Sequence, residues 1–344
     1  MSKKISIAID AMGGDNSPDK TIEGIKLFLK KNSSHEDFIL NIFGKKDVIV
    51  RKINELNINQ NNLKIFDSDK VISNEESPLT AIKNSKNTSM WNCLQHQADG
   101  KSDISLSAGN TGVLLVISRM ILKMMDGVSK PALAGLWPND KGLNVVLDLG
   151  ANIDCNDQNL IDFAKLGAAL FKSLFPNNEP VVSLLNIGSE EIKGTEILKK
   201  TSQQLRNSSN KKNFIYNGYI EGNEITNGES NVIVSDGFTG NVALKTAEGT
   251  AKFITNNLKK SLTENLLSKI SLLFSYFALK KFKEKLDPRK YNGAILLGLN
   301  GPVVKSHGGT DSIGFYYSLD LCYRIIKGNL MSEIKKNLNI SKIE

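Results

Sequence analysis

The sequence has few of the residues that build disulfide frameworks, zinc sites and nucleophilic catalytic motifs. Its three cysteines, Cys93, Cys155 and Cys322, are widely spaced, odd in number and form no C-x-x-C pair. Neither a disulfide framework nor a zinc site is therefore supported. The chain has only three histidines and no G-x-S-x-G nucleophile motif, so no familiar nucleophile constellation stands out.

Signals for nucleotides and nucleic acids are missing as well. The chain contains neither a Walker phosphate loop nor a G-x-G-x-x-G fingerprint. Nucleotide binding therefore lacks its usual signal. The basic residues form no block with interleaved aromatic residues, which argues against nucleic acid as a partner.

The start of the chain and its net charge indicate a cellular location and a class of partner. Met1 to Lys4 run directly into a strand-like segment at residues 5–9, without an apolar leader, so we expect a cytoplasmic protein. The net charge of +8 attracts phosphate-bearing partners and anionic surfaces. A compositional excess of lysine explains this charge equally well.

What the sequence does contain is a repeated order of strand, polar loop and helix. The stretch at residues 232–249 shows it best, because a short β-branched run ends in Ser235-Asp236-Gly237 and a periodic apolar pattern follows. No long linker or tandem repeat interrupts this rhythm. We therefore predict one continuous, doubly wound α/β domain over residues 1–344, with a mostly parallel sheet flanked by helices.

The individual elements follow from apolar periodicity and from turn residues. We predict helices at 18–31, 78–97, 113–122, 159–174 and 312–327, the last followed by a short basic tail, and a helix that carries Lys193 early. The predicted strands lie at 5–9, 38–43, 63–66, 103–106, 131–136, 143–147, 181–185, 214–220, 232–234 and 294–299, with residues 137–140 as a turn and residues 300–311 as a loop.

The polar loops at the strand ends favour an oxyanion ligand. In an open α/β sheet ligands bind at the carboxyl ends of the strands, and helix starts offer free N–H groups to anions. We therefore expect these loops to hold inorganic phosphate beside an acyl thioester. Separate loops contain the four aspartates Asp10, Asp15, Asp148 and Asp236. Such aspartates more often cap a helix or stabilise a turn than bind a metal.

Residues 259–287 form a lysine-flanked segment that differs from the rest. Between Lys269 and Lys280 no residue is charged. Such a run spans roughly 15 Å as a helix, about half of a bilayer's hydrocarbon core, and cannot cross it. The segment can lie in a membrane interface, with its lysines at anionic headgroups. The alternative is packing in a dimer interface or in the core, and the membrane and dimer roles can both hold. The residues expected to make these contacts are Leu266, Ile270, Leu273, Phe274 and Phe277.

Six motifs, taken together and in order, give the sequence its resemblance to a known family. They are IAIDAMGGDNSP at 7–18, SAGNTG at 107–112, DLGAN at 148–152, NIGSEEIKG at 186–194, DGFTGNVALKTAEG at 236–249 and LLGLNG with HGG at 296–309. With these motifs the chain resembles the PlsX phosphate acyltransferases from about residue 5 to residue 328. Near the last motif, Asn292 and Ile295 replace small or proline residues, which we interpret as neutral.

The resemblance implies a fold and a reaction. The fold would be Rossmann-like, related to phosphotransacetylases and isopropylmalate dehydrogenases, with residues 259–287 as a protruding helical hairpin. The reaction would move a long-chain acyl group from acyl carrier protein to inorganic phosphate, without a metal or nucleotide cofactor. It also implies a homodimer at the inner face of the cell membrane, and a membrane enzyme that uses the acyl phosphate to acylate glycerol 3-phosphate.

The resemblance further points to site residues, with roles that we assign as hypotheses. We expect His307, Lys245 and Asp236 to be catalytic, with His307 in acid–base work. The residues expected to bind phosphate or the acyl substrate are Asp15, Asn16, Lys86, Ser89, Ser107, Asn110, Thr111, Asn152, Lys193, Thr239 and Asn241.

Two other classes of function remain open from the residues alone. One is a dehydrogenase or a phosphotransacetylase that acts on coenzyme A esters, although the missing G-x-G-x-x-G motif counts against the dehydrogenase. The other is a non-enzymatic scaffold at the membrane surface, which would need only the lysine-flanked segment.

Overall fold

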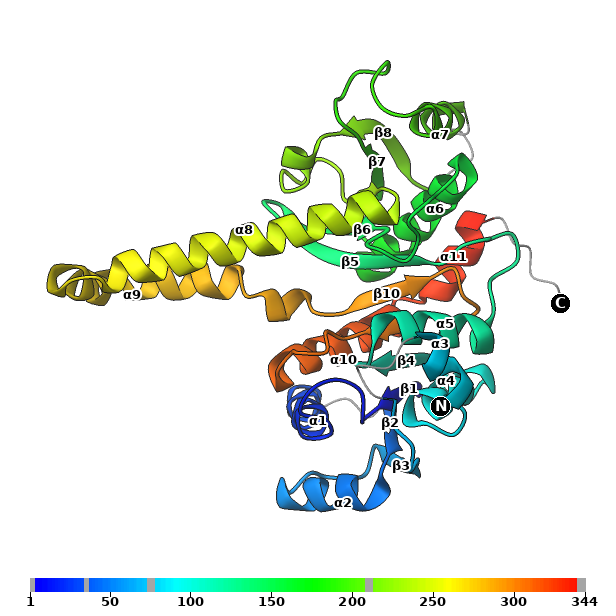
Figure 1. The fold of residues 1–344 in the computed structure, drawn as a ribbon, viewed down its shortest axis with the longest axis vertical. Helices are drawn as coiled ribbons and strands as arrows, with labels where there is room; N and C mark the ends of the chain where they lie inside the picture. Colours follow the sequence, from blue (N-terminus) through cyan, green and yellow to red (C-terminus); the bar gives the residue numbers. More distant parts are fainter. Residues whose placement is uncertain (1–3, 34–36, 73–77, 208–212, 339–344) are drawn as a thin grey trace.

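The strands of the chain form one twisted sheet that runs the length of the molecule (Figure 1). The computed structural model describes residues 4–33, 37–72, 78–207 and 213–338. Within these ranges the 11 strands lie in the order β3-β2-β1-β4-β11-β10-β5-β6-β9-β7-β8. Their bounds are β1 Ile5–Asp10, β2 Phe38–Gly44, β3 Leu63–Asp67, β4 Ile104–Ser107, β5 Ala132–Asn139, β6 Gly142–Leu147, β7 Val181–Leu185, β8 Ile215–Ile220, β9 Val232–Val234, β10 Ala294–Leu297 and β11 Val303–Lys305.

The sheet consists of two parallel halves joined by an antiparallel centre. Strands β3, β2, β1, β4 and β11 are parallel neighbours, as are β6, β9, β7 and β8. Between them, β10 pairs antiparallel with both β11 and β5, and β5 pairs antiparallel with β6. The mostly parallel sheet predicted from the sequence is confirmed.

Helices cover both faces of the sheet, so the fold is doubly wound as predicted. Helices α1, α10, α6 and α11 pack on one face, and α4 and α5 pack on the other. The bounds are α1 Asp19–Lys31, α2 Lys46–Glu55, α3 Pro78–Asn84, α4 Ser89–Ala98, α5 Thr111–Leu122, α6 Asp157–Leu174, α7 Glu196–Asn207, α8 Gly237–Thr263, α9 Leu266–Lys285, α10 Ser312–Lys327 and α11 Leu330–Leu338, with short 3-10 turns η2 Gly222–Glu224 and η3 Pro288–Tyr291.

The core beneath α1 and α10 is built from large side chains of distant segments. Phe28 of α1 meets Phe38 of β2 edge to face, with 5.2 Å between ring centroids, and Tyr323 of α10 completes the group. Full burial of each such side chain contributes about 1.5–3 kcal/mol. These contacts fix α1 and α10 on the sheet, and with them the loops at the carboxyl ends of β1 and β11.

Two of the predicted elements differ in their boundaries for backbone reasons. The helix predicted at 78–97 is two helices, α3 and α4, because Asn87 adopts a left-handed φ of 64°. Thr88 then caps α4 by accepting a hydrogen bond from the Trp91 N–H. The predicted turn at 137–140 lies largely inside β5. Pro138 is tolerated there because β10 pairs only with the start of β5, which leaves one side of this strand end open.

Three further predictions were wrong in the second half of the chain. Lys193 lies in the loop before α7 and not in a helix. The predicted loop 300–311 contains strand β11. The part of the expected basic tail that the structure describes contains helix α11, whose Leu330 and Ile334 are buried against the body, and residues 339–344 lie outside the described ranges.

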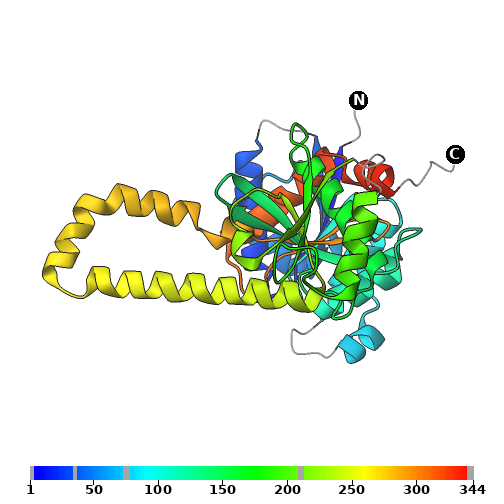
Figure 2. The ribbon, with the colours of Figure 1, turned by 90° about the horizontal axis from the view of Figure 1, so that it is seen from above.

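The lysine-flanked segment belongs to a long helical pair that projects from the body (Figure 2). Helix α8 runs unbroken from Gly237, so the pair begins well before the predicted residue 259, and α9 returns antiparallel to it. Phe274 and Phe277 are 87% and 82% exposed. The side chains of Leu266, Ile270 and Leu273 lie outside the described residues. Among the described helices, none combines the length and apolar character needed to cross a bilayer.

The start of α8 is fixed by close approach of the backbone to the loop after β6. A Cβ on Gly240 would lie 2.0 Å from the main-chain oxygen of Asp148, whereas a Cβ on Gly249 of the same helix would meet nothing within 4 Å. We predict that Gly240→Ala lowers the free energy of unfolding by about 1–3 kcal/mol through overpacking. Gly249→Ala, the matched control, should stabilise by up to about 1 kcal/mol through helix propensity. Urea unfolding measures both; equal stabilities of the two variants would contradict this packing.

Candidate functional site

Three buried polar side chains form a row at the carboxyl ends of adjacent parallel strands. Asp10 of β1 lies in register with Ser107 of β4, and Ser107 lies in register with Lys305 of β11. Partners in register project from the same face of a sheet. All three side chains are less than 9% exposed. A carboxylate, a hydroxyl and an ammonium group therefore lie side by side where an α/β fold binds its ligands.

The carboxylate of Asp10 is held by hydroxyl and main-chain donors. The Ser107 hydroxyl donates to its Oδ2 at 2.7 Å, and the Met12 N–H donates to its Oδ1 at 3.2 Å. The hydroxyl of Ser89, the first residue of α4, is also hydrogen-bonded to it. Burial raises the pKa of Asp10, against the opposing effect of these donors. Ser89 and Ser107, both predicted as site residues, are thus brought together by a residue the prediction left out.

The loops above this row touch each other through their glycines. A Cβ on Gly13 would lie 2.6 Å from the Gly109 nitrogen, and one on Gly14 would lie 2.8 Å from the Ala108 oxygen. The Asp15 N–H donates to the Gly308 oxygen at 3.0 Å. Only glycine permits such an approach. The loops after β1, β4 and β11 therefore form one continuous surface.

Two lysines beneath these loops were missed by the sequence analysis. Lys20 of α1 is 4% exposed and donates to the Gly308 oxygen, and Lys305 donates to the Ser306 oxygen. Burial lowers the pKa of Lys305 to about 8, and the nearby Lys20 contributes to the lowering. The pKa of Lys20 is also lowered by burial. Lysine is almost never this buried without compensation, so the pair makes the strand ends electropositive.

Signals for two of the missed residues existed in the sequence. Position 20 lies on the stripe of α1 that also holds Gly24 and Phe28, so a charged residue falls on a buried helix face. Asp10 ends a buried strand immediately before the glycine loop. The register that places Lys305 beside Ser107 depends on pairing between segments almost 200 positions apart in the sequence, and no local pattern reports it.

His307 follows Lys305 at the mouth of this surface. Its ring is exposed, and its Nδ1 accepts a hydrogen bond from the Gly309 N–H at 3.1 Å. A neutral ring with an accepting Nδ1 carries its proton on Nε2. Partial desolvation lowers the pKa of His307, and the ammonium groups of Lys305 and Lys245 lower it further. The imidazole is therefore neutral at pH 7 and offers an N–H donor.

Lys245 connects this cluster with the second half of the sheet. It lies on α8 and pairs with Glu248 one turn later, with Nζ 2.8 Å from Oε2. Both side chains are more than half exposed, so this ion pair is worth little and leaves Lys245 available to an anion. The charges of Lys245 and Glu248 both act on His307, which places the two predicted catalytic residues near each other.

The remaining predicted residues of the second half serve local structure. Asp236 caps α8, since its carboxylate accepts from the Thr239 N–H and the Thr239 hydroxyl, each at 2.8 Å. The amide of Asn152 donates to Asp148 Oδ2 at 2.8 Å and to the Pro131 oxygen at 2.6 Å. The Asn241 amide donates to the Leu149 oxygen at 3.1 Å. The Asn241 bond joins the loop after β6 to the start of α8.

Four other predicted residues lie in helix starts, loops or connections in the first half of the chain. Asn110 caps α5 by accepting from the Val113 N–H, and Thr111 is the exposed first residue of that helix. Asn16 is exposed with a left-handed φ of 53°. Lys86 is exposed in the connection between α3 and α4.

Lys193 and Asn152 contact other parts of the protein and not His307, Lys305 or Lys245. Lys193 approaches Glu190 at 4.0 Å within the loop after β7. Asn152 lines a separate open hollow of about 430 Å³, together with Arg119 and Lys130. Within the described ranges, no three His, Cys, Asp or Glu side chains gather where they could hold a metal ion.

The arrangement as a whole suits an anion that binds at the surface and reacts there. The N-terminus of α5 lies next to the Asp10–Ser107–Lys305 row, where the positive end of the helix dipole favours an anion. Two buried ammonium groups lie below, and Lys245 and the His307 N–H lie at the rim. Such donors can neutralise a phosphate and stabilise an oxyanion that forms beside it.

Comparisons with known proteins agree with this chemistry. The sequence matches the family model described as "Fatty acid synthesis protein" over residues 5–332. It is 56% identical over 338 residues to the phosphate acyltransferase of Pelagibacter ubique, covering 98% of this chain and all of that protein. It is 41% identical to the phosphate acyltransferase of Neisseria meningitidis serogroup C over 336 residues, which is 97% of this chain and 94% of the other.

Solved structures with the same fold are more distant in sequence. A phosphotransacetylase from Streptococcus pyogenes superposes with a TM-score of 0.62 at 14% identity, covering 96% of this chain and 95% of that one. A 4-hydroxythreonine-4-phosphate dehydrogenase from Klebsiella pneumoniae gives a TM-score of 0.54 at 11% identity, covering 94% and 99%. The predicted relation to phosphotransacetylase-like and dehydrogenase-like folds is confirmed at the level of the fold.

The charge of Lys305 should affect the pKa of His307. We predict that Lys305→Met raises the pKa of His307, because removing a nearby ammonium group favours the protonated imidazolium. Lys172→Met is the matched control, since Lys172 also donates to a main-chain oxygen, that of Asn178, but from the exposed surface of α6. NMR titration of the histidine Cε1–H signals measures both variants. An unchanged His307 pKa in Lys305→Met would contradict the electrostatic contact.

Proposed function

The chain belongs to the PlsX family of phosphate acyltransferases, and from this premise we propose that it transfers a long-chain acyl group from acyl carrier protein to inorganic phosphate. The observation that carries the proposal is the buried row of Asp10, Ser107 and Lys305 under the glycine loops, next to His307. It combines charge and N–H donors for a phosphate with a rim where a thioester can approach. We propose that this reaction is the first step of bacterial phosphatidic acid synthesis.

The reaction balances without a cofactor. A phosphate oxygen attacks the thioester carbonyl, the carbon–oxygen bond forms, and the carbon–sulfur bond breaks. Hydrogenphosphate gives up one proton and the departing thiolate takes one up, so the products are acyl phosphate and the free thiol of the carrier. The protein has to position the phosphate and stabilise the oxyanion of the tetrahedral intermediate.

We assign His307 to oxyanion stabilisation as a neutral donor, in place of the acid–base role expected from the sequence. Its Nδ1 accepts a hydrogen bond from the Gly309 N–H, so Nε2–H is the group that remains to donate to a substrate. A lowered pKa keeps this ring neutral and makes it a poor source of a proton at pH 7. Lys245 supplies positive charge to the phosphate, while Asp236 keeps the start of α8 in place.

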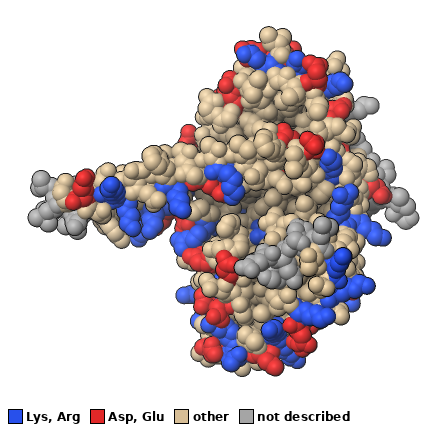
Figure 3. Space-filling view, in the orientation of Figure 1, with Lys and Arg blue, Asp and Glu red and all other residues tan. Residues whose placement is uncertain are grey.

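The acyl carrier protein is acidic, and the basic surface supports it as the donor. Lys and Arg side chains gather along the hairpin and where it meets the body (Figure 3). Charge complementarity of this kind raises the rate of encounter between partners.

We propose further that the enzyme is a homodimer that binds the inner face of the cell membrane from the cytoplasm. Apolar side chains are exposed along α8, including Phe253 at 70% and Ile254 at 56%, and in the middle of α9 at Phe274 and Phe277. Exposed apolar surface of this extent marks a contact with a partner or a lipid interface. A membrane acyltransferase that acylates glycerol 3-phosphate would then receive the acyl phosphate.

A direct assay tests the reaction. Incubation with palmitoyl-acyl carrier protein and labelled phosphate should give an acid-labile acyl phosphate, and palmitoyl-coenzyme A should be used more slowly. His307→Ala should lower kcat by about 10²-fold, the typical loss for one oxyanion donor. A faster reaction with the coenzyme A ester would favour a phosphotransacetylase. Full activity of His307→Ala would remove His307 from the site.

The role of the hairpin is tested separately. We predict that Phe274→Glu with Phe277→Glu abolishes sedimentation with phosphatidylglycerol vesicles while turnover in solution persists, because two charges would have to enter the apolar interface. Ile215→Glu, a substitution at a half-exposed apolar residue of β8, is the control and should keep vesicle binding. Light scattering decides the alternative: loss of the dimer with vesicle binding retained would place these residues in a subunit interface.

A further inference from the structure

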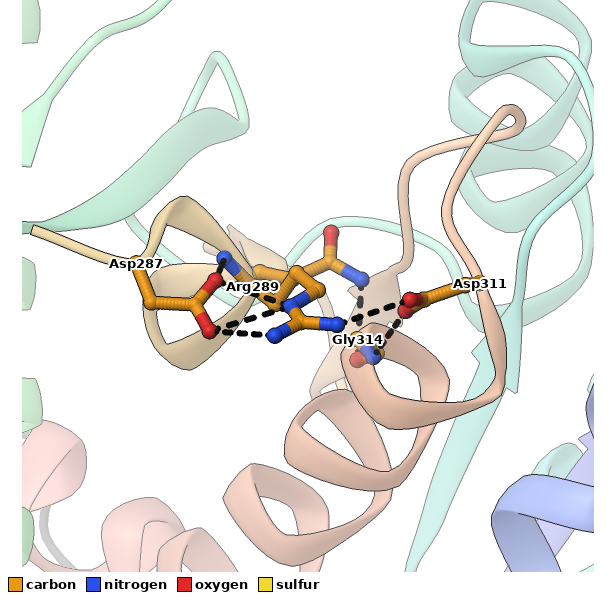
Figure 4. Close-up of polar contacts among 5 residues, drawn as sticks. Asp287, Arg289, Asp311 and Gly314 are labelled. Atoms are coloured by element: carbon orange, nitrogen blue, oxygen red, sulfur yellow. Dashed lines mark hydrogen bonds and ion pairs between the residues drawn. The ribbon is translucent and has the colours of Figure 1, made fainter. Parts of the chain in front are cut away.

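The chain segment that returns from the hairpin is tied to the start of α10. Arg289 of η3 donates from Nε and Nη2 to the carboxylate of Asp287, which immediately precedes this turn, and from Nη1 to Asp311 Oδ2 at 3.0 Å (Figure 4). Asp311 in turn caps α10 by accepting from the Gly314 N–H at 3.0 Å. One guanidinium group therefore bridges the base of the hairpin and the end of the His307 loop.

Asn292 ties the same segment to the other end of that loop. Its Oδ1 accepts from the His307 N–H at 3.0 Å. Its Nδ2 donates to the Ser306 hydroxyl at 3.0 Å and to the Gly314 oxygen at 2.9 Å. All these bonds span at least 14 positions of sequence. The side chain interpreted from the sequence as a neutral replacement thus connects the end of η3 with the His307 loop and with α10.

The loop between these two ties has little freedom of its own. The Thr310 N–H donates to the His307 oxygen at 3.2 Å, and Gly308 accepts from both Asp15 and Lys20. A Cβ on Gly314 would lie 2.0 Å from Thr310 Oγ1, so the start of α10 packs directly on the loop. The hydrogen bonds of Arg289 lower the pKa of Asp287, which keeps this carboxylate ionised at neutral pH.

We propose that Asn292 and Arg289 are positioning residues for His307, and that the base of the hairpin thereby sets the geometry of the site. Asn292 fixes the main chain at His307, and Arg289 fixes the loop end at Asp311. Because both residues follow α9 within seven positions of its last residue, Lys285, the hairpin and the histidine are joined by a short, hydrogen-bonded path. The inference rests on the proposed function only through the role of His307.

Hydrogen–deuterium exchange and steady-state kinetics test the proposal together. Asn292→Gly removes all three bonds, whereas Asn292→Asp keeps the acceptor for the His307 N–H and loses the donor. Arg289→Met removes the bridge to Asp311. Lys290→Met is the matched control, since Lys290 is the exposed cationic neighbour in the same turn. Thermal unfolding confirms that each variant is folded before the comparison.

In Asn292→Gly we expect exchange at residues 306–311 to rise about tenfold, because one of the three lost bonds is donated by a main-chain N–H of the loop, that of His307. We expect kcat to fall by a similar factor. Asn292→Asp should lie between this variant and the wild type, Arg289→Met should loosen the Asp311 end, and Lys290→Met should match the wild type. Unchanged exchange in Asn292→Gly would overturn the proposal, as would faster exchange with kcat unchanged. Wild-type protein without acyl-phosphate synthesis would instead contradict the proposed function, and the exchange data would still decide whether Asn292 holds the loop.

Discussion

The hydrogen bond between Ser107 and Asp10 is the contact on which the site depends. It joins two adjacent parallel strands at their carboxyl ends and holds a buried carboxylate that would otherwise be costly. Lys305 completes the row from the third strand, so that a negative and a positive group are buried at the same level of the sheet. The glycine loops can then close over this row.

The second half of the sheet also holds a buried carboxylate at the end of a strand. Asp148, fully buried after β6, accepts from the Leu133, Gly150 and Ala151 N–H groups through Oδ1 and from Asn152 through Oδ2. That network orients the loop against Gly237 and Gly240, which fixes where α8 starts. Helix α8 then carries Lys245 to the neighbourhood of His307 and continues outward as the first limb of the hairpin. Lys245 and the projecting surface are thus parts of one helix.

The sequence was sufficient for the features that depend on local patterns. Short β-branched runs, glycine-bearing turns and apolar periodicity located most strands and helices, and the doubly wound sheet followed from their order. The sequence-based predictions failed where an unusual backbone conformation or a residue far away in the sequence determines the structure. The left-handed Asn87 splits a helix that periodicity made continuous, and Pro138 enters a strand because the neighbouring strand ends early. The buried Lys305 and the three-way bonds of Asn292 arise from register and from contacts across the fold, which a single sequence does not display.

We propose that a phosphate binds over the buried row at the strand ends, between the start of α5, Lys245 and His307. A crystal structure of the protein grown with phosphate would locate this ion. We expect one ion within hydrogen-bonding distance of the main chain at residues 107–112, with the Lys245 ammonium and the His307 ring turned toward it. An ion bound elsewhere on the molecule, with residues 107–112, 245 and 307 too far apart to share it, would disprove this site.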